Sequence, residues 1–328
     1  MEAITKEQTS QVQSRQSNFE LLRIICMVLI VAHHFSMHSV LPDNVFGFNK
    51  FLFDAFAVGG KIAVNVFIFI TGYFMVKSSF KPKKLLYLVL QTFFYCCLIY
   101  FLFLILGYYT FDVTEMFDYV LGFYTKYWFM TGYLILYALS PFLNKIINNS
   151  SQKSLILLIL IAIALQNNLI NIDLGNLVWF CTMYFIGAYI RIYPNKIINS
   201  FRFNLILTII LFIAIILFNT LLKISLWDLK NIVGVLASIT LFCLFKNINI
   251  KNNKVINFIS SATLGIYLIH DNPIVRPVLW NNWLNVGYHI QSNNFWIFTI
   301  CAVLLVFTVC LIIEILRILL DKLFKKLK

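Results

Sequence analysis

The sequence predicts an all-α integral membrane protein, a bundle of about ten transmembrane helices with both termini in the cytoplasm. The composition, the recurrence of long apolar runs and the placement of the basic residues lead to this prediction. Hydrophobic residues make up 61% of the 328 residues and charged residues only 12%, and the mean hydropathy is +0.85. Soluble domains contain about 45–50% apolar and about 25% charged residues. A soluble fold would therefore lack the polar residues needed to cover its surface.

The apolar runs set the number of helices. Each span needs roughly 20 apolar residues, so the chain is long enough for about ten. The helices are expected at 19–41, 54–76, 84–107, 127–147, 154–170, 175–193, 203–223, 229–246, 255–273 and 295–320. Only residues 166–173 separate the fifth helix from the sixth, and merging the two would invert the second half of the protein. The aromatic and acidic segment 108–126 is expected to form a short interfacial helix.

The basic residues fall mainly on alternate loops. The side predicted to be outside keeps Lys50, Lys126, Lys223, Lys230 and Arg276. The loops on the other side and both ends of the chain carry most of the remaining Lys and Arg, in clusters such as 77–84 and 317–328. This asymmetry follows the positive-inside rule and predicts cytoplasmic termini. Clusters of this kind face anionic lipid, so the net charge of +13 does not predict nucleic acid as a partner.

The chain is expected to form one membrane domain with two polar ends. Residues 1–18 are expected to be a disordered cytoplasmic N-terminus, 19–320 the transmembrane domain and 321–328 a basic cytoplasmic tail. The first apolar run carries Arg23 and lacks a small-residue cleavage site, so we interpret it as a retained helix and not as a signal peptide. The seven cysteines lie inside apolar runs without metal-ligand spacing and are expected to be unpaired.

The first helix contains the strongest candidates for catalysis. Arg23 and His34 are eleven residues apart, which is about three helical turns, so both side chains lie on one face. Glu20 precedes Arg23 by three residues and is placed to pair with it. A histidine inside a membrane can serve as a general base. The alternative is structural: Arg23 would extend to the inner headgroups and His34 would hydrogen-bond a neighbouring helix.

Two other helices carry ionisable residues at depths where lipid is expected. Lys61 and Asn65 share one face of the second helix. His270 lies at a depth similar to that of His34, and Asp271 is placed to pair with Arg276 at the outer surface. Buried polar residues of this kind indicate functional sites, but structural roles at helix ends and interfaces stay open for all of them.

Several of these motifs together resemble the membrane acyltransferase family 3. They are Arg23 and His34 with ten residues between them, the run Phe67-Ile68-Phe69-Ile70-Thr71-Gly72-Tyr73, and Leu264-Gly265-Ile266-Tyr267-Leu268-Ile269-His270. The segment Tyr127-Trp128-Phe129, leading to Ser140-Pro141-Phe142-Leu143-Asn144, is similar to a feature of the polysaccharide-modifying members. The similarity covers nearly the whole chain, without an appended extracellular hydrolase-like domain.

The resemblance implies a bacterial cell-membrane O-acyltransferase that uses acetyl-CoA or another acyl-CoA as co-substrate, with no bound cofactor and no metal. His34 and Arg23 would be catalytic, and His34 would either deprotonate a sugar hydroxyl or carry the acyl group itself. Lysines stand where family members often have arginines before the third helix, so phosphate would be held by point charges. The candidate residues for binding donor or substrate are Glu20, Lys61, Asn65, Lys81, Lys83, Lys84, Trp128, His270 and Asp271. The expected partners are membrane lipid, acyl-CoA and a surface polysaccharide or its lipid-linked precursor.

Two other functions fit a polytopic protein with buried charges. A transporter or flippase for lipid-linked sugars is the main alternative, and it would leave the ester content of the polysaccharide unchanged. A polysaccharide polymerase is less compatible, because its arginine-bearing outer loop has no counterpart among the short outer loops expected here.

Overall fold

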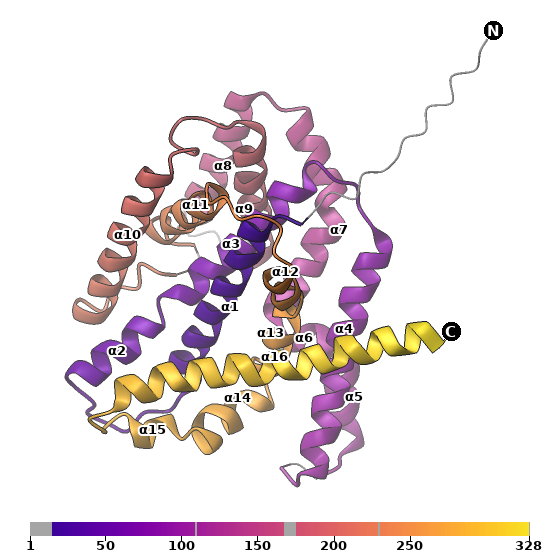
Figure 1. The fold of residues 1–328 in the computed structure, drawn as a ribbon, viewed down its shortest axis with the longest axis vertical. Coiled ribbons are helices and arrows are strands. Elements are labelled where there is room, and N and C mark those ends of the chain that lie inside the picture. Colours follow the sequence, from indigo (N-terminus) through magenta and orange to yellow (C-terminus); the bar gives the residue numbers. More distant parts are fainter. Residues whose placement is uncertain (1–14, 109, 167–174, 229, 328) are drawn as a thin grey trace.

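The computed structural model describes residues 15–108, 110–166, 175–228 and 230–327, and these residues form helices and connecting turns without a β-strand (Figure 1). The longer helices are α1 (Ser17–His38), α3 (Gly59–Met75), α4 (Pro82–Ile105), α7 (Trp128–Asn148), α8 (Gln152–Gln166), α9 (Gly175–Ile192), α10 (Phe201–Leu221), α11 (Ile232–Lys246) and α16 (Phe295–Leu327). The shorter ones are α2 (Phe48–Phe56), α5 (Val113–Leu121), α6 (Phe123–Lys126), α12 (Lys254–Ser261), α13 (Thr263–His270), α14 (Val275–Pro277), the π-helix η1 (Val278–Trp283) and α15 (Val286–His289).

The all-helical prediction is confirmed for these residues, but the number of spans is not. By length and composition, six helical segments within the described ranges can cross a membrane: Ser17–His38, Phe48–Met75, Pro82–Ile105, Trp128–Asn148, Phe201–Leu221 and Phe295–Leu323. Helices α8 and α11 are apolar but shorter. The end of the helix predicted at 154–170 lies outside the described residues. So does most of segment 166–173, which is predicted to separate this helix from the next. The count of ten and the cytoplasmic termini therefore stay predictions.

The helix predicted at 255–273 is broken into α12 and α13 at Ala262. Side-chain hydroxyls next to the break bond to nearby backbone: Ser261 Oγ donates to Phe258 O at 2.6 Å and Thr263 Oγ1 to Ser260 O at 2.9 Å. Such bonds compete with regular helix geometry and bend helices. The break gives α13, which ends at His270, a direction of its own.

The helices at both ends of the membrane domain extend beyond their predicted bounds. Residues 1–14 of the expected disordered N-terminus lie outside the described residues. Ser17 and Asn18, however, are buried in the first turn of α1, because Ser17 Oγ donates to Asn257 Oδ1 at 2.9 Å and Asn18 Nδ2 to Phe245 O at 3.0 Å. At the other end, the residues expected as a separate tail continue α16 as far as Leu327.

Helix α1 lies inside the bundle and packs against α3, α12, α13 and α16, while α16 crosses the other helices (Figure 1). The tightest helix pair is α3 with α9. A Cβ on Gly72 would lie 2.2 Å from Tyr184 O, and one on Gly187 would lie 2.3 Å from Phe69 O. Gly72 and Gly187 therefore permit the close approach of these two helices. All seven cysteines are free.

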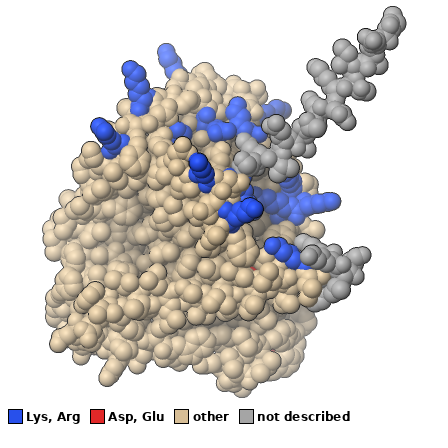
Figure 2. Space-filling model, in the orientation of Figure 1, with Lys and Arg blue, Asp and Glu red and all other residues tan. Residues whose placement is uncertain are grey.

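Figure 2 shows Lys and Arg side chains gathered at the end of the bundle where α1 begins, above a broad uncharged surface. Many apolar side chains of the described residues are exposed, including those of Ile209, Ile210 and Ile213 on α10. An apolar belt below a basic end is the arrangement that a membrane protein needs at the boundary between lipid and water.

A buried polar cluster joins α16 to α4. Glu314 is fully buried, and its carboxylate accepts hydrogen bonds from Gln91 Nε2 at 3.0 Å and from the Tyr95 hydroxyl. Arg317 adds two bonds to the same carboxylate, from Nε at 2.8 Å and from Nη2 at 2.6 Å. The negative charge is therefore fully paired inside the bundle.

Replacing Glu314 by alanine should lower the free energy of unfolding by roughly 3–5 kcal/mol, because Arg317 would lose its buried carboxylate partner. Thermal unfolding of the purified protein in detergent measures this effect. Asp321 provides a matched control, since it also pairs with Arg317, at 2.7 Å, but its side chain is 44% exposed. Asp321→Ala should cost below about 1 kcal/mol. Equal unfolding temperatures for Glu314→Ala and Asp321→Ala would contradict this explanation.

Candidate active site

A cavity of about 310 Å³ runs along α1. Arg15, Glu20, Arg23 and Lys84 line it toward the start of α1, and His34, Lys61 and Trp128 line it toward the end. The eleven-residue spacing of Arg23 and His34 places both on the cavity face, as predicted, roughly 16 Å apart along the helix axis. The cavity therefore connects a basic end of the bundle to an imidazole deep inside it.

His34 contacts His270 of α13, and the hydrogen bonds determine where the protons lie. His270 Nδ1 is 2.6 Å from Ile266 O, which can only accept, so this nitrogen carries the proton. In a neutral His270, Nε2 is then an acceptor, and it lies 3.0 Å from His34 Nδ1. His34 Nδ1 must donate, which leaves His34 Nε2 with a free lone pair. This is the state that a general base requires.

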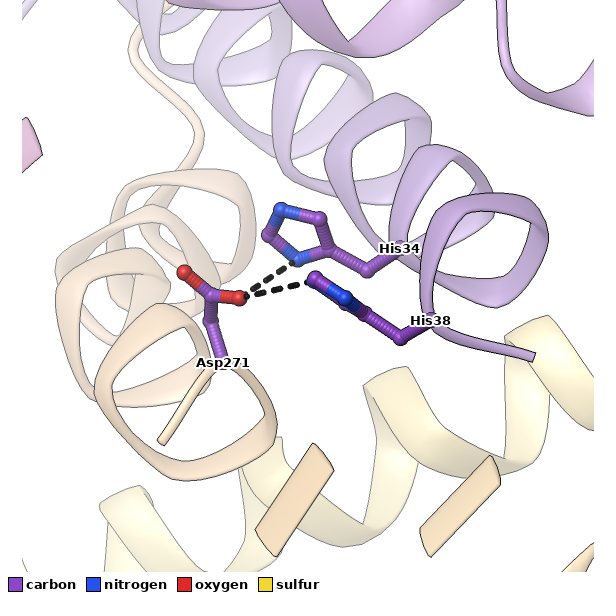
Figure 3. Close-up of side chains that lie close together, drawn as sticks. All are labelled: His34, His38 and Asp271. Atoms are coloured by element: carbon purple, nitrogen blue, oxygen red, sulfur yellow. Dashed lines mark ion pairs between the residues drawn. The ribbon is translucent and has the colours of Figure 1, made fainter. Parts of the chain in front are cut away.

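Asp271 places a carboxylate against the same nitrogen. Its side chain is 2% exposed, and Oδ1 lies 3.3 Å from His34 Nδ1, 3.4 Å from His38 Nε2 and 2.9 Å from Arg276 Nε (Figure 3). In the same view, Nε2 of His34 points away from Asp271. The predicted pair of Asp271 with Arg276 is present, and the two histidines expected at similar depth, His34 and His270, contact each other. A carboxylate behind the imidazole orients the ring and stabilises the imidazolium formed when Nε2 takes a proton.

Donor atoms of His34, His38 and Asp271 lie within 4.8 Å of one another, which is the spacing of a metal site. Two contacts favour an ion-pair centre instead. The guanidinium of Arg276 already lies against Oδ1, where it would repel a second cation. His34 Nδ1, the atom that would bind the metal, already faces His270 Nε2. The expectation that this chain has no metal site stays a prediction.

Glu20 and Arg23 form the predicted pair at the other end of the cavity. Arg23 Nη1 donates to Glu20 Oε1 at 2.8 Å, and Ser260 Oγ donates to Glu20 Oε2 at 2.5 Å. The side chain of Glu20 is 10% exposed and that of Arg23 is 30% exposed. Glu20 therefore holds the aliphatic stem of Arg23 in place while part of the guanidinium stays accessible.

The predicted lysine cluster is only partly at the site. Lys84 lines the cavity, and its Nζ lies 5.1 Å from the centre of the Tyr137 ring. Lys81 and Lys83 are exposed and lie outside the lining, so their binding role stays a prediction. Lys81 precedes the first turn of α4, and consecutive helical residues point about 100° apart, so these neighbours face different directions.

Lys61 and Trp128 line the cavity together, and Lys61 Nζ lies 4.6 Å from the centre of the Trp128 ring. Asn65 does not line it, and its binding role stays a prediction. It is 1% exposed and accepts a hydrogen bond from Trp179 Nε1 at 3.0 Å, so it joins α3 to α9. Such bonds between membrane helices are structural.

Four residues of the site did not stand out in the sequence as site residues. Ser260 and Tyr267 line the cavity, and His38 and Arg276 contact Asp271. The position of His38, four residues after His34, is a usable signal, because it puts both rings on one face of α1. Ser260 and Tyr267 carry no such signal, since Ser and Tyr are common in helices that are merely packed.

The fold and the site define a class: an all-helical protein with several helices able to cross a membrane, built around a cavity that ends at a His–carboxylate centre. A family model described as an acyltransferase domain matches residues 16–315. The chain belongs to the membrane acyltransferase family 3, as its sequence motifs predicted. Neither a curated protein nor a solved structure matches it.

Proposed function

We propose that this protein is an O-acyltransferase of the bacterial cell membrane. It transfers an acetyl group from acetyl-CoA to a hydroxyl of a surface polysaccharide or of its lipid-linked precursor. The observation that carries the proposal is the lone pair of His34 Nε2, which stays free because His34 Nδ1 donates to His270 Nε2, in a cavity with a basic end. Membership of an acyltransferase family favours this function over a transporter, and no contact in the described site favours the transporter.

The donor would enter at the basic end. Acetyl-CoA is a polyanion, and Arg15, Arg23 and Lys84 supply positive charge there. With the phosphates at this end, the long pantetheine arm of the donor extends along the roughly 16 Å between Arg23 and His34, so that the thioester comes within reach of the imidazole.

The transfer step follows from the protonation state. His34 Nε2 takes the proton of the acceptor hydroxyl as its oxygen attacks the thioester carbon, and the new C–O bond forms. The C–S bond then breaks, and the imidazolium returns the proton to the departing CoA thiolate. Asp271, 3.3 Å from Nδ1, stabilises the positive charge that the ring carries between these two events.

The test of the proposed function uses the purified full chain in proteoliposomes with acetyl-CoA labelled in its acetyl group. The acceptor is the host's surface polysaccharide after mild alkali has removed its esters. Labelled polysaccharide that loses its label on a second alkali treatment supports the proposal. Movement of a lipid-linked sugar across the bilayer without labelling would support the transporter instead.

Arg23→Ala should raise the KM for acetyl-CoA by about 10- to 100-fold, because a charge-assisted hydrogen bond contributes roughly 1.5–3 kcal/mol. The loss also leaves the Glu20 carboxylate unpaired beside the donor phosphates. Arg23→Lys should recover part of the effect, since lysine keeps the charge but not the planar fork. Arg202→Ala, at an exposed residue of α10, is the matched control. Equal KM values for the three variants and the wild type would remove Arg23 from the donor site.

A further inference from the structure

A second cavity adjoins the first. It has a volume of about 300 Å³ and is lined by Lys61, Trp128, Asn176, Asp228 and Lys230. Lys61 and Trp128 line both cavities, so the two spaces meet at this cation–π pair. The mechanism above uses the first cavity and leaves the second without a role.

The second cavity lies at the end of the bundle opposite to the donor end. Lys61 is the third residue of α3 and Trp128 the first residue of α7, while Asp228 lies in the connection from α10 to α11. These segments surround the end of α1, whereas Arg15 and Arg23 lie at its start. Gly60 fixes the close approach of α3 to α1 here, because a Cβ on it would lie 2.3 Å from His33 Cβ. A molecule in the second cavity would thus lie next to the part of the first cavity that Lys61 and Trp128 line, away from Arg15 and Arg23.

We propose that the second cavity is the acceptor subsite and that it binds a sugar ring of the glycan. The inference rests on the proposed function and adds where the acceptor binds and by which side chains. A pyranose has an apolar face of C–H groups and a rim of hydroxyls. Trp128, with 36% of its surface exposed, offers an aromatic face, and Asp228 and Asn176 offer acceptors and donors for hydroxyls. A few polar groups beside an aromatic surface are typical of small-molecule sites.

The charges of the second cavity fit a neutral sugar better than an anionic headgroup. The lining contains the carboxylate of Asp228 as well as two lysines, so the space is not uniformly basic. The donor end differs, because three basic side chains line it and the nearby carboxylate, Glu20, is already bonded to Arg23 and Ser260. The two ends thus differ in charge in the way that a polyanionic donor and an uncharged acceptor ring require.

Two substitutions in the second cavity test the inference. Trp128→Ala should weaken binding of the de-esterified polysaccharide by about tenfold, and Asp228→Asn by about fivefold. Trp128→Phe should stay within about threefold of the wild type, because phenylalanine keeps an aromatic face. The controls are Trp296→Ala, at a half-exposed residue of α16, and Asp43→Asn, at an exposed residue of the loop after α1.

Binding is measured by isothermal titration of the full chain in detergent, once with de-esterified polysaccharide fragments and once with acetyl-CoA. The inference expects weaker fragment binding by Trp128→Ala and an unchanged Kd for acetyl-CoA. It is overturned if the wild type does not bind the fragments, if the Trp128 and Trp296 variants bind equally well, or if Trp128→Ala weakens both ligands equally. If fragment binding depends on Trp128 but the protein transfers no label, the inference stands and the proposed function is rejected. If the Trp128 and Asp228 variants transfer label at the wild-type rate, the proposed function stands and the inference is rejected.

Discussion

Replacing His34 by alanine should reduce acyl transfer by on the order of 10²- to 10⁴-fold, the range that general base catalysis contributes. The reason is specific to this site. His34 Nε2 keeps a free lone pair because His34 Nδ1 donates to His270 Nε2, with the Asp271 carboxylate 3.3 Å away, whereas the neighbouring His33 directs its Nδ1 to Ala57 O at 2.6 Å. The measurement is the initial rate of labelled acetyl transfer in proteoliposomes at saturating acetyl-CoA.

His289→Ala is the control for this loss. His289 stacks on Phe298 with ring centres 4.1 Å apart and does not line either described cavity, so its removal should leave the rate unchanged. Both variants should reach the membrane at wild-type levels and unfold at similar temperatures. A folded His34→Ala protein with wild-type activity would show that His34 is structural.

Asp271→Asn should lower kcat by on the order of 10²-fold and leave the KM for acetyl-CoA unchanged. The substitution keeps the shape of the side chain but removes the charge that stabilises the His34 imidazolium. We expect a smaller loss than for His34→Ala, because His270 still sets the tautomer of His34 through its bond to Ile266 O. A full kinetic series in acetyl-CoA separates the effect on kcat from the effect on KM.

The control for this second loss is Asp118→Asn, which makes the same change at another carboxylate. Asp118 pairs with Lys126 at 2.8 Å and its side chain is 72% exposed, so Asp118→Asn should leave kcat at the wild-type value. An increase of KM with unchanged kcat in Asp271→Asn would assign this residue to substrate binding and would contradict its role behind His34.

Much of α1 could be predicted from the sequence because its signals are local. The eleven-residue spacing puts Arg23 and His34 on one face, and the three-residue spacing pairs Glu20 with Arg23. The spacing does not show which of the three neighbouring lysines, Lys81, Lys83 and Lys84, faces the cavity. It also cannot distinguish a cavity position for Asn65 from the interface with α9, where the structure places this residue.

The centre of the site is non-local and could be predicted only in part. His34 and His270 are 236 residues apart in the chain, and similar depth in two helices does not establish that these helices are neighbours. His270 ends a helix that begins after the break at Ala262, where Ser261 and Thr263 make hydroxyl-to-backbone bonds, and periodicity does not reveal such bonds. The sequence predicted the pair of Asp271 with Arg276, but only the structure shows that His38 also contacts Asp271.

The central claim is that this chain esterifies a surface polysaccharide and that His34 is the base. Proton NMR of the polysaccharide tests it most directly, in a deletion strain complemented with the native gene or with His34→Ala at equal membrane levels. The account predicts that the native gene restores an O-acetyl signal and that the variant does not. Identical ester content in all strains, with altered export of the polysaccharide, would contradict the account and indicate a transporter.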